Sequence, residues 1–270
     1  MKKEIERFAR LFRGLNRAYG SLDMTTKDAR GKQKGKYKFV HEPRTIATYE
    51  AHLKGSVSIG VVPINEDNLC WWGAIDIDQY PLDHLSILKK LKEVNIPLVV
   101  CRSKSGGAHL YLFLNELVEA EKIQVKLKEV AAEIGFGGCE IFPKQIKLVL
   151  ERGDNGNFLN LPYFDHEGGL RYAFNSDGSA ATLEEFLDLA EKSAIAEKDL
   201  DELLSEDVPE VDDKLKDGPP CLQALLRQGF PEGTRNNGLF NLGVYLRKAF
   251  PDDWETKILE YNQHIMDPPL

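Results

Sequence analysis

The strongest constraint on the fold of this chain is the order of the apolar patterns between Leu69 and Phe142. Six segments alternate between the two-residue periodicity of strands and the 3.6-residue periodicity of helices. In chain order they are a strand at 69–78, a helix at about 82–94, a strand at 97–101, a strand at 109–114, a helix at about 119–134 and a strand at 139–142. The sequence therefore predicts the element order β-α-β-β-α-β.

This order is the split β-α-β arrangement that RNA-recognition folds share with polymerase palms. The predicted fold class is α/β, of the α+β kind, with an RRM-like β-α-β-β-α-β palm at its centre. Helical and strand additions flank the palm. We expect them as a docked helix at about 3–19, a helix at 46–53, a strand at 57–62, short strands at 147–151, 158–161 and 170–174, and a helix near 183–192.

A small second domain is expected at the C-terminus, because 270 residues exceed what one palm requires. Residues 193–219 are acidic and end in a Gly-Pro-Pro sequence, which is typical of a linker. The predicted domains are a catalytic domain at 1–192, this linker, and a helical bundle at 220–270. Its three helices are expected near 221–228, 237–250 and 254–265.

Two carboxylates stand at the end of the first palm strand. Strand periodicity puts Asp76 and Asp78 on one face and Ile75 and Ile77 on the other. Repulsion between the two acids beside an apolar strand would raise at least one pKa unless a cation neutralised them. Mg²⁺ and Mn²⁺ prefer such oxygen ligands, so the pattern predicts a divalent-metal site. The alternative is a pair of solvated surface acids.

A loop rich in serine and glycine connects the second and third palm strands. Consecutive glycines let backbone N–H groups turn inward as an anion-binding nest, and hydroxyl and ammonium groups add donors. The histidine that opens the next strand can reach a bound phosphate from a rigid element. The residues expected to bind a triphosphate here are Ser103, Lys104, Ser105, Gly106 and His109. A plain turn followed by a structural histidine is the alternative.

Together, the Asp-x-Asp pair and the Ser-Lys-Ser-Gly-Gly-Ala-His segment resemble the first two motifs of the archaeo-eukaryotic primase superfamily. The resemblance is to primase-polymerases of phages, plasmids and TOTE conflict systems, and it covers about residues 45–175. It implies a nucleotidyltransferase that adds NTPs or dNTPs to a primer on single-stranded DNA, for replication of a phage, plasmid or mobile element. It also implies two Mg²⁺ or Mn²⁺ ions and a fused or separate helicase as a partner.

The resemblance implies a third acidic ligand on the strand after the second palm helix. Glu140 occupies that position, which makes Asp76, Asp78, Glu140 and His109 the expected catalytic set. Many members of the superfamily carry Asp at this position, so Asp154 and Asp165 remain alternatives. Two further residues are expected in the nucleotide pocket, namely Lys144 and Asn160.

Charge is distributed unevenly along the chain, although its net value is −8. Lysines alternate between Arg30 and Arg44 against the single acid Glu42. We expect them to follow template phosphates, with a solvated loop as the alternative. These lysines are Lys32, Lys34, Lys36 and Lys38. Arg235, before a predicted C-terminal helix, is also expected to face an anion.

Several features limit the location and cofactors of the protein. The first 20 residues are charged throughout and unlike a secretory signal, and no run approaches the roughly 18 apolar residues of a membrane span. A cytoplasmic location and no membrane partner are therefore expected. No zinc site is expected either, because the cysteines occur singly. They are Cys70, Cys101, Cys139 and Cys221.

Two other functions are open to a sheet of this kind. A non-catalytic, RRM-like nucleic-acid-binding module would need exposed aromatic residues on its central strands rather than two carboxylates. A rolling-circle replication nuclease would need a paired-histidine metal site and a tyrosine nucleophile. The segment His109-Leu110-Tyr111 contains only one histidine, which argues against the nuclease.

Overall fold

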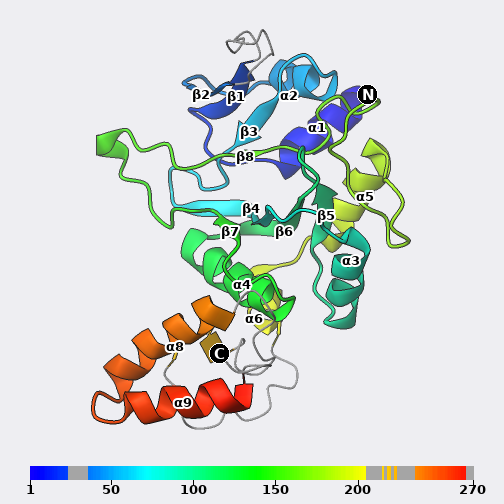
Figure 1. The fold of residues 1–270 in the computed structure, drawn as a ribbon. Coiled ribbons are helices and arrows are strands. Elements are labelled where there is room, and N and C mark those ends of the chain that lie inside the picture. Colours follow the sequence, from blue (N-terminus) through cyan, green and yellow to red (C-terminus); the bar gives the residue numbers. More distant parts are fainter. Residues whose placement is uncertain (24–35, 205–214, 216–217, 220–221, 224–234, 266–270) are drawn as a thin grey trace, which may run out of the picture. The chain divides into compact units, whose positions relative to one another are not determined.

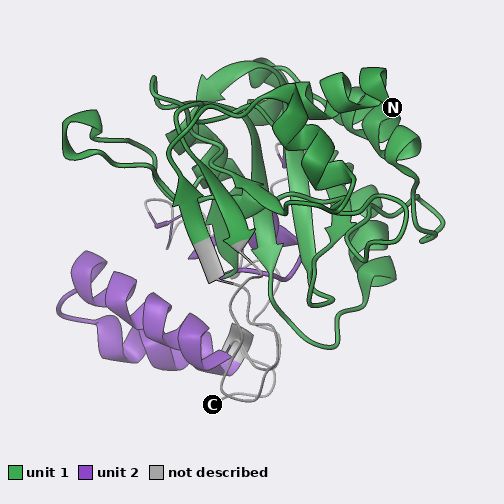
Figure 2. Cartoon of the chain, turned by 90° about the horizontal axis from the view of Figure 1, so that it is seen from above, with its two compact units in different colours: residues 1–127, 139–203 green, residues 128–138, 204–270 purple. Residues whose placement is uncertain are grey.

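The computed structural model describes residues 1–23, 36–204, 215, 218–219, 222–223 and 235–265 (Figure 1). The chain forms two compact units, which Figure 2 shows in different colours. The first contains residues 1–127 and 139–203, and the second contains residues 128–138 and 204–270. Helices are combined with antiparallel sheets, so the predicted mixed fold class is confirmed. Within the described ranges, no helix is both long and apolar enough to cross a membrane.

The central sheet of the first unit has four antiparallel strands in the order β5-β6-β4-β7. Its elements follow one another along the chain in the predicted β-α-β-β-α-β order. They are β4 (Leu69–Ile77), α3 (His84–Glu93), β5 (Val99–Arg102), β6 (Ala108–Glu119), α4 (Ala120–Glu133) and β7 (Glu140–Phe142). Strand β4 lies between β6 and β7, so its side chains have neighbours on both sides.

A second four-stranded sheet has the order β2-β1-β3-β8. Its strands are β1 (Tyr19–Asp23), β2 (Lys36–Val40), β3 (Ile59–Val61) and β8 (Leu159–Asn160). The predicted helix at 3–19 is too long, since α1 covers Lys2–Leu11 and the chain then turns into β1. One reason is that the Leu15 amide donates to the Val62 carbonyl oxygen, which ties this segment to the chain beyond β3.

Two predicted strands were wrong. Residues 147–151 instead lead into a short 3₁₀ helix, η1 (Leu150–Arg152), which ends at Gly153 in the left-handed conformation with φ 74°. Residues 170–174 make only isolated bridges, from Ala173 to Cys101 and from Phe174 to Ala180. Helix α2 (Ile46–Leu53), by contrast, has the predicted bounds, and a capping box at Thr45 explains its start.

An aromatic cluster forms the core of the first unit. The Phe12 ring makes edge contacts with Trp72 of β4 and with Tyr111 and Phe113 of β6, at centroid separations of 5.5, 5.3 and 5.7 Å. It also stacks on Phe186 of helix α5 (Leu183–Ser193). All these rings are buried, so the strands that carry the acids and His109 are held rigidly.

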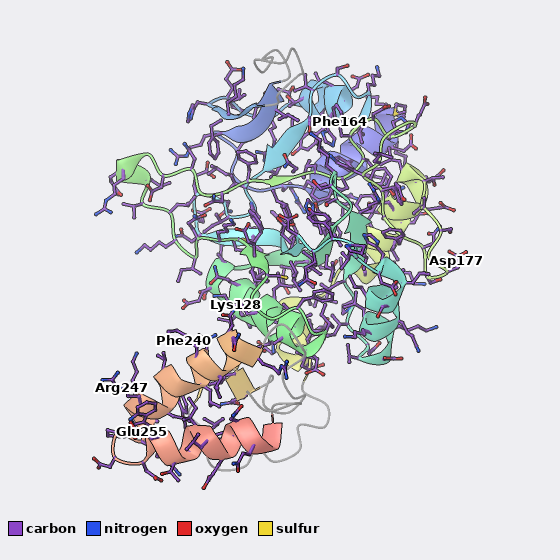
Figure 3. The ribbon with its side chains drawn as sticks, viewed as in Figure 1. Lys128, Phe164, Asp177, Phe240, Arg247 and Glu255 are labelled. Atoms are coloured by element: carbon purple, nitrogen blue, oxygen red, sulfur yellow. The ribbon has the colours of Figure 1, made fainter. Side chains whose placement is uncertain are left out.

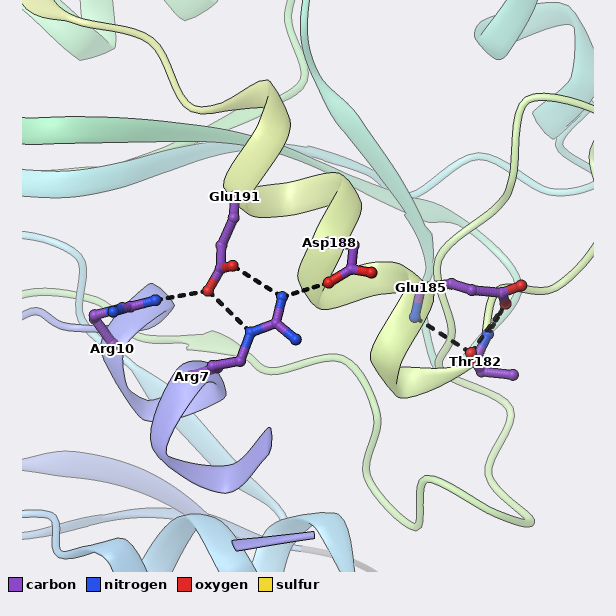
Figure 4. Close-up of polar contacts among 6 residues, drawn as sticks. All are labelled: Arg7, Arg10, Thr182, Glu185, Asp188 and Glu191. Carbon is purple, nitrogen blue, oxygen red and sulfur yellow. Dashed lines mark hydrogen bonds and ion pairs between the residues drawn. The ribbon is translucent and has the colours of Figure 1, made fainter. Parts of the chain in front are cut away.

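The docking of α1 expected from the sequence is confirmed, and ion pairs with α5 contribute to it (Figure 4). The Arg7 guanidinium donates to both carboxylate oxygens of Glu191, at 3.1 and 2.8 Å, and also to Asp188 at 2.6 Å. Arg10 donates to the same Glu191 at 2.7 Å. Such a bidentate arginine pair is more specific than an ordinary surface ion pair.

The segment expected to be a linker, residues 193–219, contains a helix near its start. Helix α6 (Glu197–Glu202) buries Leu200 and is joined to α4 by Lys122, whose ammonium group lies 3.0 Å from Glu197 and 2.8 Å from Asp201. The first compact unit includes this helix and extends to residue 203. Acidic composition suggested a linker, but the acids of α6 have a basic partner on α4.

The second unit contains α8 (Arg235–Ala249) and α9 (Trp254–Ile265), close to the predicted ranges. The unit has a small core of Leu215, Leu222, Leu242 and Leu246, and Trp254, Ile258 and Tyr261 of α9 pack against it. Figure 3 labels Phe240, Arg247 and Glu255 on these helices, and the Phe240 side chain is 71% exposed. Most of the helix predicted near 221–228 lies outside the described residues.

Candidate active site

A cavity of about 320 Å³ lies at the C-terminal end of β4. It is bordered by the Ser/Gly loop, by β7 and by the segment from Asn157 to Pro162. Nine of the residues predicted for the site line it, namely Asp76, Asp78, Ser103, Lys104, Ser105, His109, Glu140, Lys144 and Asn160. The fold thus brings together groups that the sequence separates by as many as 84 positions, from residue 76 to residue 160.

Strand pairing explains why the acids and the histidine converge. Asp76 lies directly opposite His109 on β6 and directly opposite Glu140 on β7. Side chains opposite one another on one sheet face have Cβ atoms roughly 5 Å apart. The alternatives to Glu140 lie elsewhere: Asp154 accepts a hydrogen bond from the Val149 amide, and neither it nor Asp165 lines the cavity.

The Asp76 carboxylate is placed unfavourably for an isolated charge. Its side chain is 13% exposed, and its Oδ1 atom has no hydrogen-bond partner among the described residues. Burial, followed by the charges of Asp78 and Glu140, raises the pKa of Asp76 to about 7. The His109 Nε2 atom lies 3.4 Å from this oxygen. A bound cation would remove the penalty that raises this pKa.

The other two acids have partners. The Tyr80 hydroxyl donates to Asp78 Oδ1 at 2.8 Å, and Glu140 forms an ion pair of 2.6 Å with Lys144. Within the described part of the chain, no three His, Cys, Asp or Glu side chains are yet close enough to act as a metal-ligand set. The Glu140 side chain is 60% exposed, so it has room to rotate. The oxygen donors and the unpartnered Asp76 atom fit a hard divalent cation.

The Ser/Gly loop is held tightly against the end of β4. A Cβ atom at Gly107 would lie 2.2 Å from the Ile77 carbonyl oxygen, so only glycine fits there. Gly106 has φ 97°, a conformation that also favours glycine. The Ser103 hydroxyl is buried and has no hydrogen-bond partner among the described residues. An unpartnered donor in a cavity wall suits a ligand oxygen.

His109 is buried and held in one orientation. Its Nδ1 atom lies 3.1 Å from the Tyr111 hydroxyl, which in turn donates to the Asn160 carbonyl oxygen at 3.3 Å. Burial, reinforced by the Arg171 charge, lowers the pKa of His109 to about 4. The ring is therefore neutral at neutral pH, and its Nε2 edge faces the acids.

Three residues near the acids were missed by the sequence analysis. Arg102 and Arg171 line the cavity, and Tyr80 holds Asp78. Arg171 is 7% exposed, donates to the Ser58 hydroxyl at 3.0 Å and lies over the ring of Phe164, which Figure 3 labels. Arg102 and Tyr80 could have been suspected, because each stands within two positions of a motif residue. No motif near Arg171 in the sequence indicated that it belongs to the site.

Only some of the residues predicted to contact DNA lie within the described part of the chain. Lys32 and Lys34 lie outside the described residues. Lys36 and Lys38 belong to β2, where Lys38 is exposed and does not line the cavity. Arg235 is the first residue of α8, in the second unit. A role for these residues on DNA stays a prediction.

Paired acids on a central strand, beside a Ser/Gly loop and a buried histidine, are typical of archaeo-eukaryotic primases. Residues 3–202 match the model of one family in this class, the archaeo-eukaryotic primase domain of TOTE conflict systems. The match covers most of the chain, and the chain belongs to this family. Primases of this class are generally metal-dependent. No curated protein matches the sequence.

Solved structures of primases show a distant likeness. The primase-polymerase domain of cyanophage S-2L is 12% identical, with 70% of this chain and 98% of that chain covered and a TM-score of 0.39. The primase RepB′ is 13% identical over 93% and 76% of the two chains, with a TM-score of 0.37. Its catalytic domain in complex with initiator DNA is 12% identical over 76% and 97%, with a TM-score of 0.36.

Proposed function

We propose that this protein is a DNA primase-polymerase, a nucleotidyltransferase that extends a primer with NTPs or dNTPs opposite a single-stranded DNA template. The observation that carries the proposal is the meeting of three acids, a Ser/Gly loop and a buried histidine in one cavity. Membership of a primase family supports a function of this type. In the reaction, the primer 3′-oxygen bonds to the α-phosphorus while the bond to pyrophosphate breaks.

Asp76, Asp78 and Glu140 would hold two Mg²⁺ or Mn²⁺ ions. When bound, such ions neutralise charge on the triphosphate and lower the pKa of the attacking hydroxyl. The unpartnered Oδ1 atom and raised pKa of Asp76 support this assignment. Rotation of Glu140 toward Asp76 would release Lys144, whose ammonium group could then pair with a phosphate.

The triphosphate would lie against the Ser/Gly loop. Ser103, Lys104 and Ser105 offer hydroxyl and ammonium donors to the cavity, and the buried His109 ring also lines it. Arg102 and Arg171 also line the cavity and add positive charge to it. Asn160 borders the same space. Cations around a polyanion are the arrangement that phosphoryl-transfer sites use for positioning.

Replacing Lys104 and His109 together with alanine should weaken binding of a non-hydrolysable nucleotide by about 10-fold or more, since both lie at the proposed phosphate position. Titration calorimetry measures this directly. Binding of single-stranded DNA should change far less. Lys89→Ala is the matched control, because Lys89 is an exposed residue of α3 outside the cavity. Unchanged nucleotide affinity in the double variant would show that the loop is only a turn.

The second unit is proposed to help start primers. It has its own small core, and all the residues that line the cavity with the acids belong to the first unit. Truncation after Leu203 should therefore abolish primer synthesis from single nucleotides and retain extension of a supplied primer. Gel analysis of labelled products from both reactions checks this. A truncated protein that starts primers as well as the full chain would leave the second unit with a stabilising role alone.

The two alternative functions find less support in the described residues. Three aromatic side chains of the central strands, Trp72, Tyr111 and Phe113, are fully buried and cannot stack on bases, while Trp71 is partly buried and is covered on one face by Arg13. Burial also raises the pKa of the Tyr111 hydroxyl well above its usual range, which does not suit a nucleophile.

Incubation of the protein with single-stranded DNA, Mn²⁺ or Mg²⁺ and labelled nucleotides, with and without a primer, tests the proposed function. Products longer than the primer are expected when both metal and template are present. Binding of DNA without any incorporation under either condition would favour the non-catalytic module.

A further inference from the structure

A second cavity, of about 530 Å³, lies near the N-terminal end of β4. Its lining includes Arg13, Arg44 and Trp71, and none of the described residues that line it is acidic. No residue lines both this cavity and the one that contains the acids. Five positions along β4 separate Trp71 from Asp76, which corresponds to roughly 16 Å of extended strand.

Arg13 is held flat against an aromatic ring. Its guanidinium carbon lies 3.5 Å from the centre of the Trp71 ring, and its Nε atom donates to the Arg10 carbonyl oxygen at 2.8 Å. The backbone is also fixed, because the Trp72 indole donates to the Arg13 carbonyl oxygen at 2.7 Å. One face of the guanidinium is covered by the indole, while the Arg13 side chain is exposed and lines the cavity.

Arg44 is the second fixed cation. Its Nε atom donates to the Tyr49 hydroxyl at 2.9 Å, and its Nη1 atom donates to the carbonyl oxygens of Leu15 and Ala18. Among the described residues, no hydrogen bond involves the Nη2 atom of Arg44. Neither Arg13 nor Arg44 forms an ion pair within those residues, so the cavity contains two uncompensated positive charges beside an aromatic surface.

We propose that this cavity binds one nucleotide of a single-stranded nucleic acid, with the base stacked on the free face of Arg13 and a phosphate paired with Arg44. Proteins stack unpaired bases on arginine planes and aromatic rings, and arginine matches phosphate geometry closely. The volume is in the range of small-ligand pockets. The proposed contact with the nucleic-acid strand is separate from the acids and needs no divalent metal. The proposal therefore does not depend on whether the chain polymerises nucleotides.

Fluorescence anisotropy with a labelled oligodeoxyadenylate of about 15 nucleotides, in the presence of EDTA, tests the proposal. Arg13→Ala should weaken binding about 10-fold, the loss of one stacked base and one cation. Arg13→Lys keeps the charge and removes the flat surface. It should still weaken binding of the adenylate oligomer, but not of an abasic oligomer of the same length.

Three controls make the result decisive. Lys89→Ala removes an exposed charge elsewhere and should bind as the wild type does. Melting curves verify that each variant is folded, and Arg13→Lys still tests the proposal if Arg13→Ala does not fold. Wild-type affinity for the adenylate oligomer in both Arg13 variants would overturn the proposal. So would loss of dATP binding with unchanged oligomer binding, because the site would then serve free nucleotides.

Discussion

Asp76→Asn and Asp78→Asn are each expected to abolish nucleotide incorporation, a loss of at least about 10³-fold. Each substitution keeps the size of the side chain and removes the charge that the proposed ions require. The two acids are proposed to act only through metal, so the protein should remain folded. Primer extension with Mn²⁺ and Mg²⁺ measures the effect. Asp67→Asn is the matched control, since Asp67 is an exposed acid in the turn before β4 and outside the cavity.

Asp76→Asn is expected to increase the stability of the folded protein even though it abolishes activity. The pKa of Asp76 is raised from 3.8 to about 7 in the folded protein, so ionisation costs stability increasingly as the pH rises through this range. Below about pH 3.8, Asp76 is protonated in both the folded and the unfolded protein, so its ionisation does not lower stability. Above about pH 7 without divalent metal, Asp76→Asn should therefore raise the melting temperature. A variant that melts lower and still incorporates nucleotides would contradict the assignment of Asp76 twice over.

Glu140→Gln is expected to lower incorporation by at least about 10²-fold. Glu140 lies opposite Asp76 on β7, and the substitution keeps its size while removing its charge. Loss of the ion pair with Lys144 should cost little stability, because the pair is partly exposed. Steady-state primer extension measures the rate, and melting curves verify the fold.

Two acids that the resemblance left open serve as controls for Glu140. Asp154→Asn and Asp165→Asn should incorporate nucleotides at wild-type rates, because neither residue lines the cavity. Glu140→Asp should recover part of the activity at raised Mn²⁺ concentration. Wild-type rates in Glu140→Gln, together with a loss in either control, would transfer the third ligand to that residue.

The palm could be predicted because its elements are long and strongly periodic. Leu69–Ile77 buries six of its nine residues and Ala108–Glu119 buries eight of its twelve, and the helices between strands alternate apolar and charged residues regularly. The sheet formed by β1 and β2 was not predicted. The lysines of Lys36–Val40 suggested a loop, but backbone pairing with Tyr19–Asp23 determines the conformation there. Local composition does not report such a long-range contact.

In the candidate site, too, local sequence patterns indicated some residues, while others are brought in only by long-range contacts. Alternation along one strand placed Asp76 and Asp78 on a common face, and local glycine chemistry identified the Ser/Gly loop. The pairing of Asp76 with Glu140 depends on the register of β4 with β7, which the sequence indicated only through a family resemblance. Arg171 enters the cavity from a segment without regular structure, and its burial against Phe164 and Ser58 is a tertiary effect.

The most direct test of the central claim is a primer-extension experiment on two DNA templates that differ only in the first base beyond the primer. With Mn²⁺ or Mg²⁺, the wild-type protein should add the nucleotide complementary to each template base, and EDTA should stop the reaction. Addition of the same nucleotide on both templates, or no metal-dependent addition on either, would contradict the claim that this cavity performs template-directed nucleotidyl transfer.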